Sequence, residues 1–555
     1  MRVIALIMVA VAALDAGVAA LVFRSWLAAV VALALVAAIG WRIRSGRSQR
    51  AGSKAAGWAL GPAEELSDPD RPTRYPEAVI PSDVLNLGLL VIGSPGAGKT
   101  ESVELGYLAA LDTHSPGSGW AFFEGKGDVD VYKRCVAMGR RPDHLFSTEL
   151  PGSDSINLMA GEPHDVVDRL SKMLIGSTAS TTFYADEQRA VLARMVGLLA
   201  RLGIPVSLRD LYVVLSTEDA GLELLRRAQA VGAPAADVTL TRQWLEQPFR
   251  KRLEFLRGLL NRLNVFVAGP AADRLNAYQA EMDIHRIVTE NRSVYLHLPL
   301  TTFARDVAIA IVEMFGVEAR KRQLAGTEGL TRFPLLFDDW GAFFYEGFGP
   351  FAARCRSAAM PLTFGFQSYA QLEAVSRVFA HELDDTIATK VVMRVQGAET
   401  ADYAVRLLGE HERVEVSTSR LGDRSGTSVG YRRVPRIEPR DLRELRPGEA
   451  FVSTLIHDGD RVINPLWRLR FSLPDFGGWR DVPLPPPRVH AEGDGLGFWA
   501  RYMDPDAQAR LHAAAQDALE RDAQERTGAA VVGAAAERAR LAANPGFRVL
   551  PVTST

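Results

Sequence analysis

A glycine-rich stretch in the first fifth of the chain carries residue types that bind phosphate. The residues are Gly93, Ser94, Pro95, Gly96, Ala97, Gly98, Lys99 and Thr100. An apolar run typical of a buried strand precedes them at 85–92, and residues 101–111 after them have the pattern of a helix. A strand, a glycine loop and a helix in this order form a phosphate-binding loop. The glycines let the backbone curl so that N–H groups point at phosphate oxygens, and the helix N-terminus adds partial positive charge.

Two side chains at the end of this loop have separate tasks in such a site. Lys99 would reach the β- and γ-phosphates, and the Thr100 hydroxyl would bind Mg²⁺. A glycine-rich turn without a ligand is the alternative, but the flanking strand and helix favour the nucleotide site. The stretch therefore predicts a site for ATP and Mg²⁺, with Lys99 as a catalytic residue.

A second apolar strand ends in two neighbouring carboxylates. Residues 334–339 read Pro-Leu-Leu-Phe-Asp-Asp, which is the pattern of a Walker B motif. We expect Asp338 to orient the Mg²⁺ shell and Asp339 to position or deprotonate the attacking water. An apolar run that ends in two acids is common on its own, so its weight here comes from the complete phosphate loop in the same chain.

Three more polar residues follow predicted strands or lie between them. Gln367 ends a strand and could sense the γ-phosphate or align water; a buried structural glutamine is the alternative. Lys126 lies in a Gly-Lys-Gly-Asp loop and could touch phosphate or a neighbouring subunit, or could be a solvated turn lysine. Arg356 could project into a neighbour's nucleotide site and supply charge in the transition state, or could form a surface salt bridge.

The elements that must position these residues alternate between strands and helices. Predicted strands occupy residues 85–92, 119–124, 143–146, 293–299, 334–339, 360–368, 389–395 and 449–455. Helical patterns such as those at 131–139 and 304–323 lie between them. This alternation predicts an α/β fold with a mostly parallel sheet covered on both faces, which gathers ligands at the carboxyl ends of its strands.

Composition limits the classes of protein to consider. The 555 residues suffice for several domains, and 47% of them are hydrophobic, as in an ordered protein. The formal net charge is −2, so any DNA-binding surface must be a local patch or a channel lining. The two cysteines, Cys135 and Cys355, give neither a disulfide framework nor a zinc site and suit a reducing cytosol.

The N-terminal segment is apolar enough to enter a membrane. Residues 3–41 are apolar except for Asp15, Arg24 and Ser25. A basic cluster follows, made of Arg42, Arg44, Arg47, Arg50 and Lys54. Because basic residues on both flanks favour the cytoplasmic side, we predict a transmembrane helical hairpin over residues 1–43 with a very small outer loop. A single span is the competing interpretation, and a cleaved signal peptide fits the length of the apolar region less well.

The remaining sequence suggests a division of the chain. We predict a linker at 44–80, a nucleotide-binding domain in two parts at 81–159 and 291–481, an inserted all-α domain at 160–290, and a Pro-rich linker with a helical tail at 482–555. In the helical part, Arg250, Lys251, Arg252, Arg257 and Arg262 lie along one stretch. They could hold DNA phosphates, although such a run is more often a solvated face.

Several motifs in a fixed order make the chain resemble a known family. They are the apolar N-terminal segment, the 93–100 loop, residues 124–128, 156–158, 335–340 and 364–372, the run 399–402 leading to 408–409, and residues 442–451. In this order they resemble type IV secretion coupling proteins of the TraD/TraG class, within the FtsK/HerA-like P-loop superfamily. The resemblance covers most of residues 1–475.

This resemblance implies a RecA-like P-loop ATPase in a homohexamer anchored in the bacterial inner membrane, with the bulk of the chain cytoplasmic. Its partners would be DNA, a relaxase or relaxosome, and the inner-membrane components of a type IV secretion channel, and ATP hydrolysis would drive conjugative transfer. In the family, an arginine finger and a glutamine near the γ-phosphate would correspond to Arg356 and Gln367 of this chain.

One residue departs from the family pattern. Its second Walker B acid is usually glutamate, whereas this chain has Asp339, which is one methylene shorter. Two other functions stay open on the sequence: a substrate-receptor scaffold for protein secretion, and an FtsK-like chromosomal DNA translocase. The second lacks support from a winged-helix-like C-terminal module or a large membrane part.

Overall fold

The computed structural model describes most of the chain between residues 57 and 490. The described ranges are residues 57–68, 72–175, 183–299, 301–326, 329–339, 345, 347–373, 384–421, 424–458, 461–490 and 498. By its contacts the chain divides into two units, residues 1–57 and 58–555. The predicted membrane hairpin at 1–43 and nearly all of the predicted tail lie outside the described residues. None of the helices within the described ranges combines the length and the apolar character that crossing a bilayer requires.

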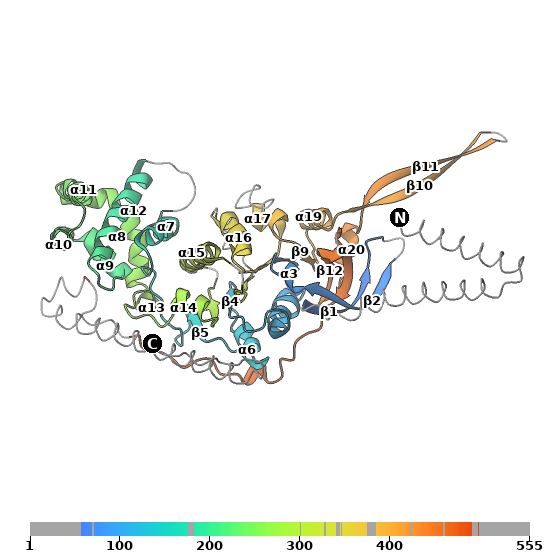
Figure 1. Ribbon diagram of the computed structural model, residues 1–555, viewed down its shortest axis with the longest axis horizontal. Coiled ribbons are helices and arrows are strands. Elements are labelled where there is room, and N and C mark those ends of the chain that lie inside the picture. Colours follow the sequence, from blue (N-terminus) through green and yellow to red (C-terminus); the bar gives the residue numbers. More distant parts are fainter. Residues whose placement is uncertain are drawn as a thin grey trace, which may run out of the picture. The chain divides into compact units, whose positions relative to one another are not determined.

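One large sheet organises the described part of the chain (Figure 1). Within the described residues it has eleven strands in the order β2-β1-β15-β12-β9-β3-β8-β7-β4-β6-β5. The strands from β9 to β5 are parallel, which confirms the predicted mostly parallel sheet. They are β3 (Leu89–Ile92), β4 (Trp120–Glu124), β5 (His144–Ser147), β6 (Ser293–His297), β7 (Leu335–Asp338), β8 (Leu362–Phe366) and β9 (Thr389–Val392).

The other strands extend the sheet past β9. β12 (Glu449–Ser453) pairs antiparallel with β9 and β15 (Leu466–Arg470), and β15 pairs antiparallel with β1 (Gly57–Glu65). β2 (Thr73–Pro81) forms the edge. The prediction of a linker throughout 44–80 is therefore wrong for β1 and β2. In β1 the side chains of Trp58, Leu60 and Ala63 are buried, although glycine and proline in this stretch resemble a linker.

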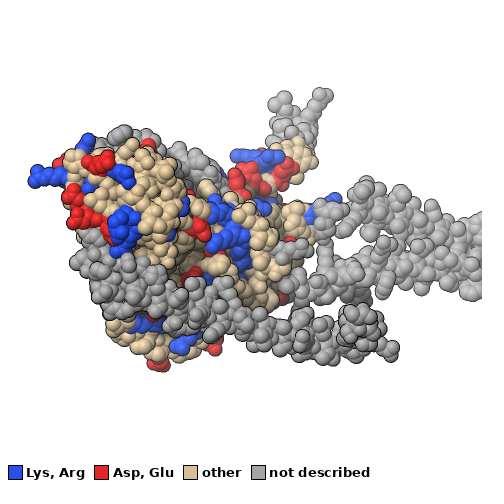
Figure 2. All heavy atoms as spheres, turned by 60° about the vertical axis from the view of Figure 1, so that its left-hand side comes forward, with Lys and Arg blue, Asp and Glu red and all other residues tan. Residues whose placement is uncertain are grey.

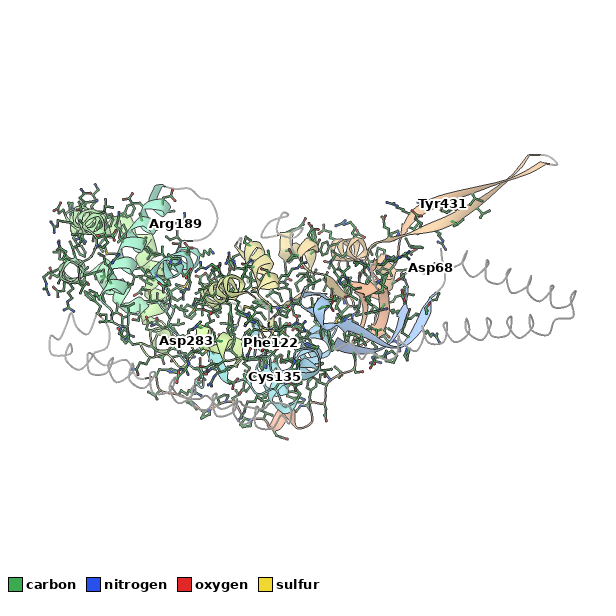
Figure 3. The ribbon with its side chains drawn as sticks, in the orientation of Figure 1. Asp68, Phe122, Cys135, Arg189, Asp283 and Tyr431 are labelled. Atoms are coloured by element: carbon green, nitrogen blue, oxygen red, sulfur yellow. The ribbon has the colours of Figure 1, made fainter. Side chains whose placement is uncertain are left out.

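The central strands are buried on both faces, which explains their continuous apolar sequences. Successive residues of a strand point to opposite faces. Leu90 and Ile92 of β3 accordingly belong to one hydrophobic core, and Leu89 and Val91 to another. Helices α15 (Thr302–Ala325), α16 (Phe348–Ser357) and α19 (Ala398–Leu408) contribute to the first core. Helices α4 (Leu105–Ala109) and α6 (Val129–Ala137) contribute to the second, where Phe122 and Cys135 are buried (Figure 3).

Most of the described chain between β5 and β6 is helical. Its helices are α7 (Pro163–Leu174), α8 (Phe183–Arg201), α9 (Leu208–Ser216), α10 (Glu218–Ala230), α11 (Ala235–Leu245), α12 (Phe249–Ala268), α13 (Ala272–Leu275) and α14 (Ile284–Thr289). The chain enters and leaves this region side by side, because Ile156 forms a β-bridge with Met282, and Asn157 with Asn276.

Residues 410–421 and 424–435 form a long hairpin, which the sequence patterns did not predict. β10 (Glu410–Leu421) and β11 (Arg424–Pro435) pair along their whole length and form a separate two-stranded sheet (Figure 1). Tyr431 on β11 is 75% exposed (Figure 3). The polar and charged residues of this stretch hide the two-residue period that would have predicted strands.

Shorter elements complete the described chain. They are α3 (Ser82–Leu85), α5 (Leu111–His114), α17 (Tyr369–Glu373), α20 (Pro439–Arg443), the hairpin of β13 (Ile456–Asp458) and β14 (Arg461–Ile463), and the turn η3 (Trp479–Asp481). After η3 the Pro-rich segment packs on the body: the Arg488 N–H donates to Pro151 O at 2.9 Å. Basic and acidic side chains alternate in small groups over the face shown in Figure 2.

Candidate nucleotide-binding site

The predicted phosphate loop connects β3 to a π-helical turn, η1 (Lys99–Glu104). Gly96 and Gly98 have φ angles of 72° and 99°, a region that glycine adopts easily. A Cβ at Gly98 would lie 3.0 Å from Ser102 Oγ and 3.2 Å from Gly448 N, so a larger residue would also meet a steric barrier. The helix predicted at 101–111 is instead divided into η1, α4 and α5. Gly96, Gly98, Lys99 and Thr100 of the loop and the start of η1 line one pocket.

Lys99 is held at the mouth of this loop. Its ammonium donates to Gly93 O at 2.9 Å and lies 3.6 Å from Asp339 Oδ1. The side chain is 4% exposed, and this burial lowers the pKa of Lys99 below its usual value. The charge of Asp338 opposes that shift, since a nearby anion favours the protonated amine.

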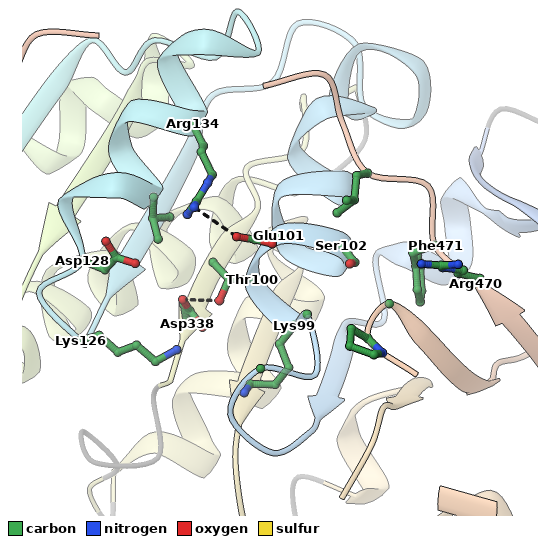
Figure 4. A pocket seen from close by; sticks show the side chains of 16 residues that line it. Lys99, Thr100, Glu101, Ser102, Lys126, Asp128, Arg134, Asp338, Arg470 and Phe471 are labelled. Carbon is green, nitrogen blue, oxygen red and sulfur yellow. Dashed lines mark hydrogen bonds and ion pairs between the residues drawn. The ribbon is translucent and has the colours of Figure 1, made fainter. Parts of the chain in front are cut away.

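Thr100 and Asp338 form the predicted metal-binding pair. Thr100 Oγ1 donates to Asp338 Oδ2 at 2.8 Å (Figure 4). The other oxygen, Asp338 Oδ1, is buried and has no hydrogen-bond partner among the described residues. Mg²⁺ in phosphate-transferring sites is held by one or two protein oxygens together with phosphates and waters. A threonine hydroxyl beside a buried carboxylate with an unused oxygen fits this requirement.

Three of the predicted catalytic residues meet at one carboxylate. Asp339 directly follows β7 and has a φ of 48°, which is uncommon for a residue other than glycine. Gln367 Nε2 donates to Asp339 Oδ1 at 2.9 Å, and the Lys99 ammonium approaches the same oxygen. Lys126 forms an ion pair with Asp339 Oδ2. Because β7 and β8 are parallel neighbours, Asp339 and Gln367 lie at the same edge of the sheet.

The loop that carries Lys126 is anchored by the last residue of β4. The carboxylate of Glu124 accepts the N–H groups of Lys126 at 2.8 Å, Gly127 at 2.8 Å and Asp128 at 3.1 Å. Burial raises the pKa of Glu124 to about 7, although these hydrogen bonds oppose the increase. Gly127 has a φ of 80° and Pro299 lies against it, so the loop has little freedom there.

Arg356 lies away from the other predicted site residues. It is near the C-terminus of α16, beside Asn86, Gly88 and Leu362. Gly88 and Leu362 are at the amino ends of β3 and β8, whereas the phosphate loop follows the carboxyl end of β3. The structure thus does not bring Arg356 to the phosphate loop of its own chain.

Several residues of the pocket belong to no motif in the sequence. The pocket has a volume of about 540 Å³ and is lined by Lys99, Thr100, Lys126 and Asp338 at one end and by Pro447, Gly448, Arg470 and Phe471 at the other (Figure 4). Gly448 N donates to Ala97 O at 2.9 Å, and Phe471 N donates to Gly448 O at 2.9 Å. These bonds connect the phosphate loop to β12 and β15, so the second end comes from strands far away in the sequence.

Two charged residues in and beside the pocket were not predicted from the sequence either. Arg134 of α6 lines it and lies 3.2 Å from Glu101 Oε1 (Figure 4). The Trp479 ring packs 4.3 Å from the Arg134 guanidinium. Glu104 is fully buried, and burial raises its pKa well above the usual value, with the charge of Asp338 adding to the shift. In the sequence, Glu104 is marked only as an acid within the helix predicted at 101–111.

Comparison with known proteins finds similarity to coupling proteins. A family model described as the TraM recognition site of TraD and TraG matches residues 343–447. The type 4 coupling protein DotL of Legionella pneumophila is 21% identical over 446 residues, or 67% of this chain and 56% of DotL. This chain thus aligns with little more than half of DotL.

Solved structures of a second relative share the fold. The unbound conjugative coupling protein TrwB superimposes with a TM-score of 0.50 at 17% identity, over 71% of this chain and 86% of TrwB. TrwB in complex with the ATP analogue ADPNP gives a TM-score of 0.51 at 16% identity, over 74% and 91% of the two chains. The family model and the curated relative thus make the chain similar to type IV coupling proteins, and the solved structures share its fold.

Proposed function

We propose that this chain is an ATP-driven coupling protein that delivers a relaxase–DNA substrate to a type IV secretion channel. The observation that carries the proposal is the meeting of Lys99, Thr100, Asp338, Asp339 and Gln367 at the carboxyl edge of one sheet, in a fold shared with coupling proteins. Two acids, a lysine and a glutamine from distant positions meet in this site, and such groupings cluster at functional sites. Binding of a triphosphate with its metal explains why they gather.

The residues of the chain divide the work of hydrolysis between them. Backbone N–H groups of the loop and the Lys99 ammonium hold the β- and γ-phosphates, while Thr100 and Asp338 hold Mg²⁺. When bound, Mg²⁺ neutralises charge that develops on the phosphate oxygens. Asp339 and Gln367 orient a water whose oxygen attacks the γ-phosphorus. The bond from that phosphorus to the β–γ bridging oxygen breaks, ADP leaves with the oxygen, and a water proton passes to Asp339.

Arg356 would complete the site of a neighbouring subunit. It lies on the opposite side of the sheet from the phosphate loop of its own chain, so it could act only in trans. A guanidinium that reaches the transferring phosphoryl group from a neighbour raises kcat strongly in other NTPases. The proposal therefore includes a ring of identical subunits, with a hexamer as the expected state.

We also propose functions for the helical region at 160–290 and for residues 1–43. The helices from α7 to α14 form the proposed inserted domain at 160–290, and the adjacent bridges at Ile156 and Asn157 support an insertion. Residues 1–43 would anchor the chain in the inner membrane, with the rest cytoplasmic. DNA would pass along the ring, guided by local basic groups rather than by net charge.

A groove on the helical region supports a second candidate function, a receptor for secreted proteins. Residues of α9 and α12 line a pocket of about 540 Å³, among them Tyr212, Arg250, Arg257 and Asn261. Arginine and tyrosine side chains suit the recognition of a peptide segment. A receptor would need ATP binding to order the ring but would tolerate the loss of hydrolysis.

One pair of measurements separates the two functions. The full chain, purified with detergent, is assayed for ATP hydrolysis with and without DNA, and transfer is measured in a mating assay. A motor predicts DNA-stimulated hydrolysis and loss of DNA transfer in both Lys99→Ala and Asp339→Ala. The receptor function predicts that Asp339→Ala still supports delivery of its substrate. Equal hydrolysis with and without DNA would count against the motor.

A further inference from the structure

The carboxylate expected to position the attacking water is already engaged in the described site. Asp339 is 4% exposed, and both of its oxygens face positive or hydrogen-bonding groups. Oδ2 is paired with the Lys126 ammonium, and Oδ1 lies 2.9 Å from Gln367 Nε2 and 3.6 Å from the Lys99 ammonium. Both oxygens are therefore occupied by protein groups, and neither is open to bind the attacking water. The arrangement is therefore a resting one.

The two amines that hold Asp339 differ in their freedom to leave it. The Lys99 side chain is 4% exposed and is also bonded to the carbonyl of Gly93. The Lys126 side chain is 39% exposed, lines the nucleotide pocket and extends across it from the α6 side (Figure 4). Lysine has a flexible four-carbon stem and a compact charge that can change partners while its backbone stays in place.

The backbone under Lys126 is fixed, which gives its side chain a defined reach. Glu124 binds the N–H groups of residues 126, 127 and 128, and Asp128 caps α6 by accepting the Asp130 N–H at 2.9 Å. The ammonium can thus move between anions within the pocket without any change in the loop. A bound γ-phosphate would supply a second anion there, with more negative charge than one carboxylate.

We propose that Lys126 senses the γ-phosphate: it pairs with Asp339 when the site is empty or holds ADP, and it moves to the γ-phosphate when a nucleoside triphosphate binds. This transfer releases Asp339 to bind the attacking water. The inference rests on the proposed nucleotide site and adds a residue that distinguishes the triphosphate from the diphosphate. Hydrolysis removes the γ-phosphate, so Lys126 returns to Asp339 and the site rests until the next ATP arrives.

The test compares two nucleotides in one variant. The full chain, with Lys126→Gln and a matched control Lys133→Gln, is titrated with ADPNP and with ADP in the presence of Mg²⁺. Lys133 is on α6, outside the pocket lining, and lies 4.0 Å from Asp130. Because a hydrogen bond to a charged group contributes about 1.5–3 kcal/mol, Lys126→Gln should weaken ADPNP binding about tenfold to a hundredfold. ADP binding should change by less than about twofold, and Lys133→Gln should affect neither nucleotide.

A conservative variant separates sensing from a structural effect. Lys126→Arg keeps the charge and should restore much of the preference for ADPNP over ADP that Lys126→Gln loses. The inference is overturned if Lys126→Gln binds ADPNP like the unmodified chain, or if it loses ADP and ADPNP affinity equally. If the unmodified chain binds neither nucleotide, the proposed function itself is wrong. This outcome differs from a failure of the Lys126 inference alone, in which the unmodified chain still binds ADPNP.

Discussion

Thr100 and Asp338 are 238 positions apart in the sequence, and their side chains are joined by a hydrogen bond of 2.8 Å. The bond brings the end of the phosphate loop to the carboxyl end of β7, where Thr100 and Asp338 would hold Mg²⁺. Asp338 keeps one buried oxygen without a hydrogen-bond partner in the described part of the chain. Such an oxygen costs free energy unless a ligand binds it.

Replacement of Asp338 by Asn should therefore separate nucleotide binding from metal use. The amide keeps the size of the side chain but removes the charge that attracts Mg²⁺. We expect Asp338→Asn to lower kcat for ATP hydrolysis about a hundredfold or more and to raise the Mg²⁺ concentration needed for half-maximal rate. A Mg²⁺ titration of the hydrolysis rate measures both. An unchanged Mg²⁺ requirement would exclude Asp338 as a metal residue.

Loss of the second carboxylate should leave binding intact. Asp339→Asn keeps the hydrogen bond from Gln367 possible but cannot accept a proton from water. General-base catalysis contributes about a hundredfold to ten-thousandfold, so we expect a loss of that size in kcat with little change in the affinity for ADPNP. Single-turnover hydrolysis and ADPNP titration give the two quantities. Hydrolysis at the normal rate would mean that another group positions the water.

Arg356→Ala should show a defect that depends on neighbouring subunits. The residue lies away from the phosphate loop of its own chain, so nucleotide binding should persist while hydrolysis falls. In other NTPases a trans-acting arginine contributes about a thousandfold or more to kcat. Mixing Arg356→Ala chains with Lys99→Ala chains should restore part of the activity, since intact sites form between different subunits. If no mixture recovers activity, Arg356 does not act in trans.

The raised pKa of Glu124 should make the unfolding free energy depend on pH. The folded-state pKa of Glu124 is about 7, above its usual value of 4.5, so the folded chain holds a proton that the unfolded chain has released between these pH values. The contribution of Glu124 to stability therefore falls as pH rises from 4.5 to about 7. Denaturant unfolding at several pH values should show a smaller decrease in Glu124→Gln than in the unmodified chain. Parallel pH profiles would contradict the raised pKa.

Substitution of Gly365 in β8 should show how tightly the buried side chain of Glu104 packs against this strand. A Cβ at Gly365 would lie 2.1 Å from Glu104 Oε1, so Gly365→Ala should force Glu104 to move. Overpacking of a core typically costs about 1–3 kcal/mol of unfolding free energy. The double variant Gly365→Ala, Glu104→Ala should recover part of that loss in a denaturant melt. If the two losses add instead, Glu104 does not occupy this space.

The core of the site was predictable because its signals are local. The loop from Gly93 to Thr100 carries its own glycines, and an apolar strand before Asp338 marks the same sheet edge. Parallel strands bring their carboxyl ends together, so Gln367 could be placed beside Asp339 without any knowledge of long-range contacts.

Other parts depend on long-range packing and could not be read from sequence. Phe471 and Gly448 reach the pocket through β15 and β12, which are antiparallel strands with no phosphate-binding pattern. The π-helical turn after Lys99 follows from contacts with the neighbouring strands rather than from helix propensity. The same holds for β1, where antiparallel pairing with β15 gives an extended conformation to a stretch that resembles a linker.

Binding of Mg²⁺-ATP to the purified full chain tests the central claim most directly. Isothermal titration of the unmodified chain should show saturable binding of Mg²⁺-ADPNP, and Lys99→Ala should abolish or strongly weaken it because it removes the ammonium bonded to Gly93. If the folded chain shows no measurable affinity for Mg²⁺-ADPNP, or if Lys99→Ala binds it equally well, the phosphate loop does not hold a nucleotide and the account is contradicted.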